Sequence, residues 1–383
     1  MRIEKKLLSA GFGLALLVPA FAEAADVTLP STLTWTAYNV SSTGYNQAVA
    51  IGKTLMDAYG ATLRVVPGKN DISRLSPVRD GKIQFSAAGS GTFYAFEGVL
   101  DFANAGWGPQ PVRLMISARS NACLSMGTAK DANIATPADM KGKRVGWVRG
   151  APALQTNVSA MMAFGDLTWD DVVKVEMPGF AAAWRGLANG QIDAMTGFTV
   201  GGLAKAAEAS PRGLHWLAFP HSDTAGWERI AAMAPHMLKT TATLGVAGIS
   251  KDNPMECIAF PYPILIAYEN QDADLTYNMT RAVSDQFPNF SGALPAAKGW
   301  ATERQTFQWV VPYHEGAIRF WKENGQWTDA MQAHNDRLVE RQKVMLAAWK
   351  GMTGQDKDDF KGRWMVARAA ALTKAGFKPI WTK

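Results

Sequence analysis

Short loops of small and polar residues carry most of the chemistry that this sequence offers. Small residues let backbone N–H groups approach a bound molecule closely, and hydroxyl groups can donate hydrogen bonds to carboxylate oxygens. We therefore predict a cradle for a small anion in the first part of the chain. Its residues are Ser42, Thr43, Gly44, Tyr45 and Asn46 in one loop, and Ser90, Gly91 and Thr92 in another. Helix capping alone would explain the same residue types.

Two further loops belong to the middle of the chain. Arg149, Gly150 and Ala151 precede an expected helix, and Thr196 and Gly197 end a short apolar run. Arg149 is the main candidate for a charge-assisted hydrogen bond to an anionic ligand, because its loop opens a helix. A surface arginine is the alternative. We include all five residues in the predicted binding site.

A repeated sequence unit is expected to position these loops. Residues 75–89 and 184–197 each read as a helix end, a glycine, a short apolar strand and a loop of small residues. Gly81 and Gly190 suit the position after a helix, which usually needs a positive φ. Two copies of the unit predict two similar α/β lobes, with a ligand cleft between the ends of their strands.

The predicted fold is therefore α/β, with two hinged lobes and a C-terminal helical extension. Apolar segments near residues 114 and 262 are the candidate crossings between the lobes. We expect one lobe to comprise residues 25–117 with 259–324, and the other to comprise residues 118–258. Residues 325–383 are typical of charged amphipathic helices that pack on a lobe. A helix that binds a partner is the alternative.

Residues 1–24 have the pattern of a secretory signal peptide. Basic residues precede an apolar stretch, and Ala22 and Ala24 form a small-residue cleavage site. An uncleaved anchor is the alternative, but the apolar stretch is short for a membrane span and contains Pro19. We expect cleavage before Ala25 and a periplasmic protein.

Composition argues against several other classes of site. The formal net charge is +6, but lysine and arginine are scattered, so nucleic-acid binding has no support. The histidines lack the close spacing of metal ligands, and no cofactor is expected. Cys123 and Cys257 are the two cysteines. An oxidising compartment would permit a disulfide between them, whereas their apolar surroundings favour buried free thiols.

A series of motifs resembles the TAXI receptors, the extracytoplasmic solute-binding subunits of one class of TRAP transporter. The motifs are residues 42–46, 68–71, 80–84, 136–145, 190–194 and 312–320, within a resemblance that runs from about residue 34 to 323. The resemblance implies a type II periplasmic binding protein. It also implies capture of a small carboxylate, such as glutamate or 2-oxoglutarate, for sodium-coupled membrane subunits.

The leading prediction is therefore a monomeric receptor, not an enzyme, for a small organic anion that is a carboxylate or an amino acid. A periplasmic partner of a sensor kinase would use the same cleft and remains the alternative. A secreted enzyme is less favoured, because the sequence has no Gly-x-Ser-x-Gly elbow, metal cluster or obvious Cys–His arrangement. Asp193 could serve as an acid, but its place after Ile192 is more typical of a turn or a cap.

Overall fold

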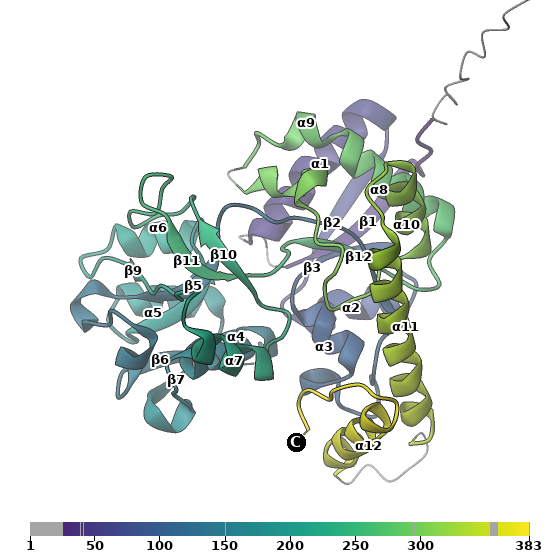
Figure 1. The fold of residues 1–383 in the computed structure, drawn as a ribbon. Coiled ribbons are helices and arrows are strands. Elements are labelled where there is room, and N and C mark those ends of the chain that lie inside the picture. The colour runs from purple at the N-terminus through teal and green to yellow at the C-terminus, as the bar shows by residue number, and fades with distance from the viewer. Residues whose placement is uncertain are drawn as a thin grey trace, which may run out of the picture.

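The chain folds into two lobes that lie side by side, each built on a mixed β-sheet (Figure 1). The computed structural model describes residues 26–38, 40, 42–149, 151–294, 296–352 and 359–382. The predicted signal peptide, residues 1–24, and the candidate site residue Gly150 lie outside these ranges. Within them, no helix is both long enough and apolar enough to cross a membrane.

The first sheet has the strand order β2-β1-β3-β12-β4. Its strands are β1 (Thr32–Ala37), β2 (Thr62–Pro67), β3 (Phe85–Ala88), β4 (Val112–Ser117) and β12 (Ile264–Tyr268). β1 pairs in parallel with β2 and β3, whereas β12 runs antiparallel to β3 and β4. The late strand β12 is thus inserted among strands from the start of the chain.

The second sheet has the order β10-β11-β5-β8-β6-β7, with β9 paired to β5. Its strands are β5 (Leu124–Thr128), β6 (Arg144–Val148), β7 (Val173–Met177), β8 (Ala194–Phe198), β9 (His215–Trp216), β10 (Leu238–Ala242) and β11 (Met255–Ala259). β6 is parallel to β7 and β8, and β5 is antiparallel to β8. This central part of the sheet has the pattern of the first sheet, with β5 in the place of β12.

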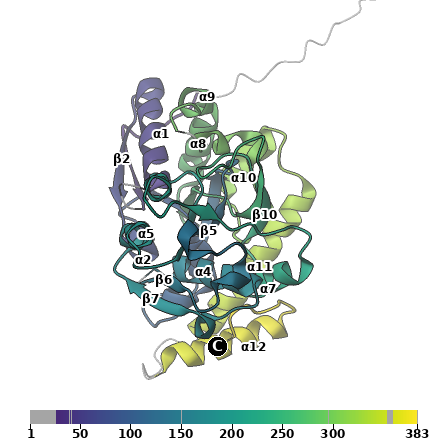
Figure 2. The same cartoon turned by 90° about the vertical axis from the view of Figure 1, so that its left-hand side faces the viewer.

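The helices cover the two sheets and fill the ends of the lobes. They are α1 (Thr43–Tyr59), α2 (Asp71–Arg79), α3 (Gly91–Glu97), α4 (Pro152–Phe164), α5 (Phe180–Ala188), α6 (Gly202–Glu208), α7 (Thr224–Met233), α8 (Ala273–Asp285), α9 (Phe287–Phe290), α10 (Glu315–Glu323), α11 (Asp329–Lys350) and α12 (Phe360–Lys374). Seen from the side of the second lobe, α1, α8 and α9 lie at one end of the molecule and α12 at the other (Figure 2).

The predicted repeat corresponds to equivalent parts of the two lobes. Gly81 precedes β3 and Gly190 precedes β8, and both have positive φ angles, of 68° and 81°. The side chain of the residue before each strand also accepts an equivalent hydrogen bond from a backbone amide. Gln84 accepts a hydrogen bond from the Thr34 amide at 3.0 Å, and Asp193 accepts one from the Arg144 amide at 3.1 Å. These matches confirm the expected α/β fold with two related lobes.

Two chain segments connect the lobes, residues 118–123 after β4 and residues 260–263 after β11. They are hydrogen-bonded to each other: the Ala118 amide donates to Pro263 at 2.8 Å, and the Tyr262 amide donates to Ala118 at 2.7 Å. The lobe boundaries expected from the sequence stay predictions. A pair of crossings held together in this way is suited to act as a hinge.

Cys123 and Cys257 form a disulfide, with their Cα atoms 6.3 Å apart. This corrects the interpretation that favoured free thiols. Cys123 immediately precedes β5, and Cys257 lies in the adjacent strand β11, so the sheet brings the two residues together across 134 positions of sequence. The bond joins the end of the first connecting segment to β11, the strand that leads into the second connecting segment.

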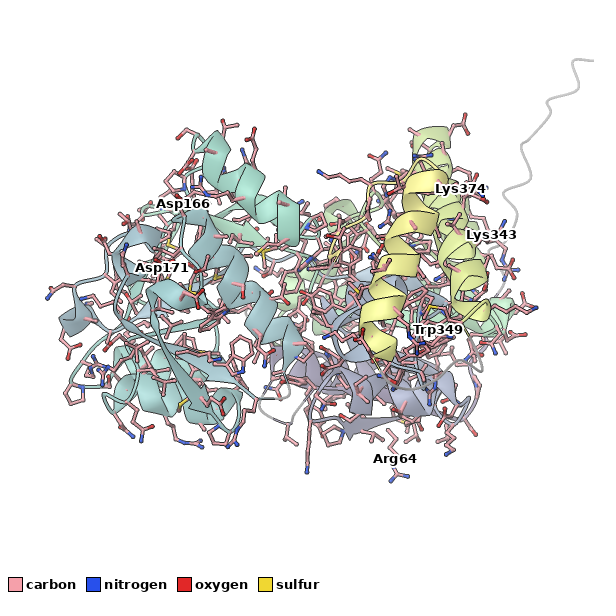
Figure 3. All side chains as sticks on the ribbon, turned by 90° about the horizontal axis from the view of Figure 1, so that it is seen from below. Arg64, Asp166, Asp171, Lys343, Trp349 and Lys374 are labelled. Carbon is pink, nitrogen blue, oxygen red and sulfur yellow. A yellow bond between two sulfur atoms is a disulfide. The ribbon has the colours of Figure 1, made fainter. Side chains whose placement is uncertain are left out.

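The C-terminal helices α11 and α12 pack on the first lobe. Glu97 at the end of α3 is 1% exposed and accepts hydrogen bonds from Arg341 of α11 at 2.7 and 2.9 Å. Arg368 of α12 binds the same carboxylate. Trp349 of α11, which is labelled in Figure 3, packs against Trp364 of α12 with ring centroids 4.8 Å apart. The buried ion-pair cluster and the aromatic contacts attach the extension to α3.

Candidate functional site

A cavity of about 140 Å³ lies between the lobes, at the carboxyl ends of the central strands. Tyr38 follows β1, Gly89 and Ser90 follow β3, and Gly197 lies near the end of β8. The two connecting segments contribute Phe260 and Tyr262. Ligand sites in open α/β sheets characteristically occur in a crevice at this edge.

The charged part of the cavity wall is supplied by α2. Asp71 and Arg74 form an ion pair one turn apart on this helix, and each side chain is only 7% exposed. Asn70 begins the helix with a capping box, in which its side chain accepts a hydrogen bond from the Ser73 amide at 2.9 Å. This cap fixes the residue at which α2 begins, and therefore the face of the helix on which Asp71 and Arg74 lie.

Three buried polar atoms of residues in the cavity wall have no hydrogen-bond partner among the described residues. They are Nε of Arg74, Oδ1 of Asn157 and Nε1 of Trp184. Arg74 belongs to the first lobe, whereas Asn157 lies on α4 in the second lobe. Buried polar groups are nearly always satisfied in folded proteins. Unsatisfied atoms from both lobes therefore indicate a place where another molecule can bind.

The opposite wall of the cavity is aromatic and comes largely from the second lobe. Phe180 and Trp184 lie on α5, with ring centroids 6.4 Å apart. Phe198 stacks on Tyr262 with centroids 5.1 Å apart and ring planes inclined by 18°. Gly197 is required here, because a Cβ atom at that position would collide with the indole ring of Trp184. The wall offers flat apolar surfaces to a ligand.

The tyrosines of the cavity stay uncharged at neutral pH. Burial raises the pKa of Tyr262 and of Tyr38, and the nearby Arg74 guanidinium opposes the shift in both cases. The Arg74 guanidinium carbon lies 4.9 Å from the centre of the Tyr38 ring, which is the geometry of a cation–π contact. Arg74 is thus held by Asp71 and by an aromatic face.

Six of the predicted site residues line this cavity: Ser42, Thr43, Ser90, Gly91, Ala151 and Gly197. They come from both lobes. Ser42 also caps α1, since its side chain accepts a hydrogen bond from the Tyr45 amide at 3.2 Å. Gly44 lies behind the cavity wall, where a Cβ atom would come within 3.0 Å of the Tyr262 hydroxyl.

The remaining described residues of the predicted site lie elsewhere. The Arg149 side chain is 66% exposed and lies 3.8 Å from Glu176 on β7, so the expected ion pair from this residue into the cleft is corrected. Thr196 is fully buried within the sheet and donates to the Ser125 carbonyl at 3.4 Å. Thr92 is buried and does not line the cavity.

Tyr45 and Asn46 are also outside the cavity. Tyr45 borders a separate shallow groove with Val49 and Leu63, and Asn46 is exposed. The cause is the helical period: only the first residues of α1 face the second lobe, and the following positions turn away. The expectation that the Tyr45 ring covers a ligand is therefore corrected.

Sequence reasoning missed Asp71, Arg74 and Asn157, and most of the aromatic wall. The sequence does contain a pattern that could have indicated the charged pair. Residues 68–71 form a polar loop between a strand and a helix, which is the same arrangement that led to the choice of Ser42 and Thr43. The burial of the pair depends on Gly91 of α3, where a Cβ atom would collide with the Asp71 carboxylate. That contact is tertiary and has no local signature.

Comparison with known proteins assigns the family. The NMT1-like family matches residues 38–325. This chain belongs to the NMT1-like family. The family region contains every residue of the cavity wall and ends before α11, so the helices that attach to Glu97 lie beyond it. Among the described residues of this NMT1-like protein, no cluster of three or more histidine, cysteine, aspartate or glutamate side chains could hold a metal ion.

Solved structures with detectable similarity share little sequence with this NMT1-like protein. An ancestral arginine-binding protein bound to arginine is 13% identical, covering 70% of this chain and 99% of that one, with a TM-score of 0.42. The alkanesulfonate-binding protein SsuA from Xanthomonas axonopodis pv. citri, bound to MOPS, is 11% identical (86% and 96% covered, TM-score 0.43). The periplasmic aliphatic sulphonate binding protein SsuA from Escherichia coli is also 11% identical (92% and 91% covered, TM-score 0.43).

Proposed function

We propose that this NMT1-like protein is a periplasmic solute-binding receptor that captures a small organic carboxylate or amino acid between its lobes. The observation that carries the proposal is a cavity lined by strand-end loops of both sheets, with a buried arginine in its wall. Closure of two lobes around a solute removes the solute from water. The cost of that desolvation is offset when charged groups of the solute meet buried, oriented partners such as Arg74.

The side chains of the cavity suit binding better than catalysis. The titratable residues in the described wall are Tyr38, Asp71, Arg74 and Tyr262. The two tyrosines have raised pKa values, and the two charged residues bind each other. The Ser42 hydroxyl in the wall is engaged as a helix cap, and the carboxylate of the described wall, Asp71, is bound by Arg74. A nucleophile with its general base, as covalent catalysis requires, is not assembled by these residues.

We propose a TRAP-type transporter as the membrane partner, on the strength of the motifs that resemble TAXI receptors. A sensor kinase is the alternative partner. The test is uptake of the identified solute by cells that lack either this chain or the membrane subunits. Loss of uptake in both strains supports transport. Normal uptake with a lost transcriptional response to the solute would favour the sensor.

Binding itself is tested by a thermal-shift screen over amino acids, dicarboxylates, 2-oxoacids and aromatic acids. A ligand that binds only the native state raises stability by about 2.7 kcal/mol at a concentration 100 times its dissociation constant. Hits are measured by calorimetry on the wild type, on Arg74→Gln and on Arg64→Gln, an exposed arginine of β2. We expect Arg74→Gln to weaken binding at least tenfold and Arg64→Gln to bind normally. Equal affinity in all three proteins would place the ligand elsewhere.

A further inference from the structure

We propose, resting on the receptor function above, that the cavity selects a zwitterionic α-amino acid with a large apolar side chain. The ligand carboxylate is assigned to Arg74, its ammonium group to Asp71 and Asn157, and its side chain to the aromatic wall. Asp71 and Asn157 are thus specificity-determining residues. Three separate observations carry the proposal: the charge balance of the cavity, its unsatisfied polar atoms and the composition of its far wall.

The charges of the cavity balance. Within the described wall, Asp71 and Arg74 are the charged residues, and they already neutralise each other. A ligand carboxylate that binds Arg74 competes with Asp71 for the guanidinium. Asp71 would then be left as a buried carboxylate with a weakened partner, which is strongly unfavourable. A ligand that brings its own cation supplies the missing charge, whereas a simple carboxylate does not.

The unsatisfied atoms require a ligand that both donates and accepts hydrogen bonds. Arg74 is 6% exposed and its Nε can only donate, whereas Asn157 is 3% exposed and its Oδ1 can only accept. Nε of Arg74 can bind an oxygen atom of the ligand, and Oδ1 of Asn157 can bind an N–H group of the ligand. A zwitterionic amino acid offers both groups two bonds apart. One residue comes from each lobe, so such a head group also holds the lobes together.

The rest of the wall excludes a second charged group. Phe180, Trp184 and Phe198 face the cavity together with three leucines, Leu124, Leu154 and Leu203. A dicarboxylate held at Arg74 would bring its second carboxylate against these side chains. The unpaired Nε1 of Trp184 offers one neutral donor there, which does not compensate the lost hydration of a charged group. An apolar or aromatic side chain would instead stack on the side chains of this wall. The expectation of glutamate or 2-oxoglutarate, implied by the TAXI resemblance, is thereby replaced.

The test is calorimetry on the full mature chain with four matched molecules. L-phenylalanine has both head groups and an apolar side chain. 3-Phenylpropanoate lacks the ammonium group, 2-phenylethylamine lacks the carboxylate, and L-glutamate has a charged side chain. We expect L-phenylalanine to bind at least tenfold more tightly than each of the other three. The comparison uses one wild-type protein, so it does not depend on how well any variant folds.

Two variants then separate the roles of the polar residues. Asp71→Asn removes the anionic partner of the ammonium group, and Asn157→Leu removes the free acceptor on the second lobe. Both should weaken L-phenylalanine at least fivefold. Asn157→Leu should change 3-phenylpropanoate less than twofold, and Asp71→Asn should strengthen it, because no buried carboxylate is then left short of a counter-charge. Asp166→Asn is the matched control, since the Asp166 side chain is 86% exposed on the second lobe (Figure 3). Equal losses for both ligands would reduce Asp71 and Asn157 to structural roles and overturn the assignment.

The outcomes distinguish this inference from the receptor function. If 3-phenylpropanoate or L-glutamate binds as tightly as L-phenylalanine, the zwitterion assignment is wrong and the receptor function stands. If none of the four molecules binds and the wider screen finds only ligands other than amino acids with apolar side chains, the zwitterion assignment is also wrong and the receptor function stands. If the wider screen and mass spectrometry of protein purified from its native host both find no ligand, the receptor function fails as well.

Discussion

Asp71 and Arg74 form a buried ion pair within one turn of α2, and two glycines make room for it. A Cβ atom at Gly91 would collide with the Asp71 carboxylate, and one at Gly68 would come within 2.5 Å of Cγ of Arg74. Gly91 begins α3, and Gly68 precedes the capped start of α2. The pair is thus held by the junction of two loops that follow parallel strands, which is where the two lobes meet.

Gly91→Ala should displace Asp71 and disturb the ion pair without adding or removing a charge. We expect ligand affinity to fall at least tenfold, because losing a well-placed buried ionic contact typically costs about 2–5 kcal/mol of binding. Calorimetry with the ligand from the screen measures the effect. Gly292→Ala is the matched control, since a Cβ atom there has no neighbour within 4 Å. Wild-type affinity in Gly91→Ala would show that the position of Asp71 does not matter for binding.

Glu97→Gln should destabilise the protein strongly. The Glu97 carboxylate binds Arg341 and Arg368, which are 8% and 0% exposed, so its neutralisation leaves two buried guanidinium groups short of a counter-charge. Breaking a buried ion pair in this way typically costs about 3–5 kcal/mol. Urea denaturation measures the loss. Glu228→Gln, at an exposed glutamate, is the control. An equal stability for the two variants would mean that the extension is not attached through Glu97.

Removal of the disulfide should lower stability by about 2–5 kcal/mol, the usual range for a native disulfide. The double variant Cys123→Ser and Cys257→Ser tests this in thermal unfolding. Dithiothreitol should reproduce the loss in the wild type and have no effect on the double variant, because the chain has 2 cysteines in all. A wild-type melting temperature that dithiothreitol leaves unchanged would contradict the bond.

His236 should make the protein less stable at acidic pH. Burial lowers the pKa of His236 to about 3, and its ring is fully buried among Phe93, Tyr94 and Phe260. An unfolded histidine titrates near pH 6.5. The unfolded state therefore binds more protons between these two values, so the stabilising contribution of neutral His236 is present above about pH 6.5 and is lost as the pH falls.

His236→Phe removes this titration and fills the same aromatic space. We expect its unfolding free energy to vary less than that of the wild type between pH 7 and pH 4. The difference in slope should approach about 1.4 kcal/mol per pH unit. His215→Gln, at an exposed histidine of β9, should keep the wild-type profile. Parallel profiles for His236→Phe and the wild type would exclude His236 as the titrating group.

The fold was more predictable than the site because short patterns in the sequence indicate where helices end and strands begin. The glycines at 81 and 190 each terminate a helix and precede a buried strand, and this local rule was enough to predict two related lobes. The disulfide could not be derived in the same way. Cys123 and Cys257 become neighbours only because β5 pairs with β11, and their apolar surroundings suit a thiol as well as a disulfide.

Only part of the cavity wall was predicted, and the failures have physical causes. Ser42, Ser90 and Gly197 were found because strand-end loops of small residues are recognisable. Arg149 was chosen for its place before α4, but its side chain turns toward Glu176 on the neighbouring strand. Arg74 follows Asp71 by one helical turn, a spacing that also occurs in exposed ion pairs. The contacts that bury this pair come from segments distant in sequence.

The central claim is that a solute binds between the lobes at Arg74. The most direct test is a crystal structure of the protein with the tightest ligand from the screen. We predict electron density for the ligand in the cavity between α2 and α5, with its carboxylate within hydrogen-bonding distance of the Arg74 guanidinium. Density for the ligand on the exposed surface beside Arg149, or in a cleft that does not include Arg74, would contradict the account.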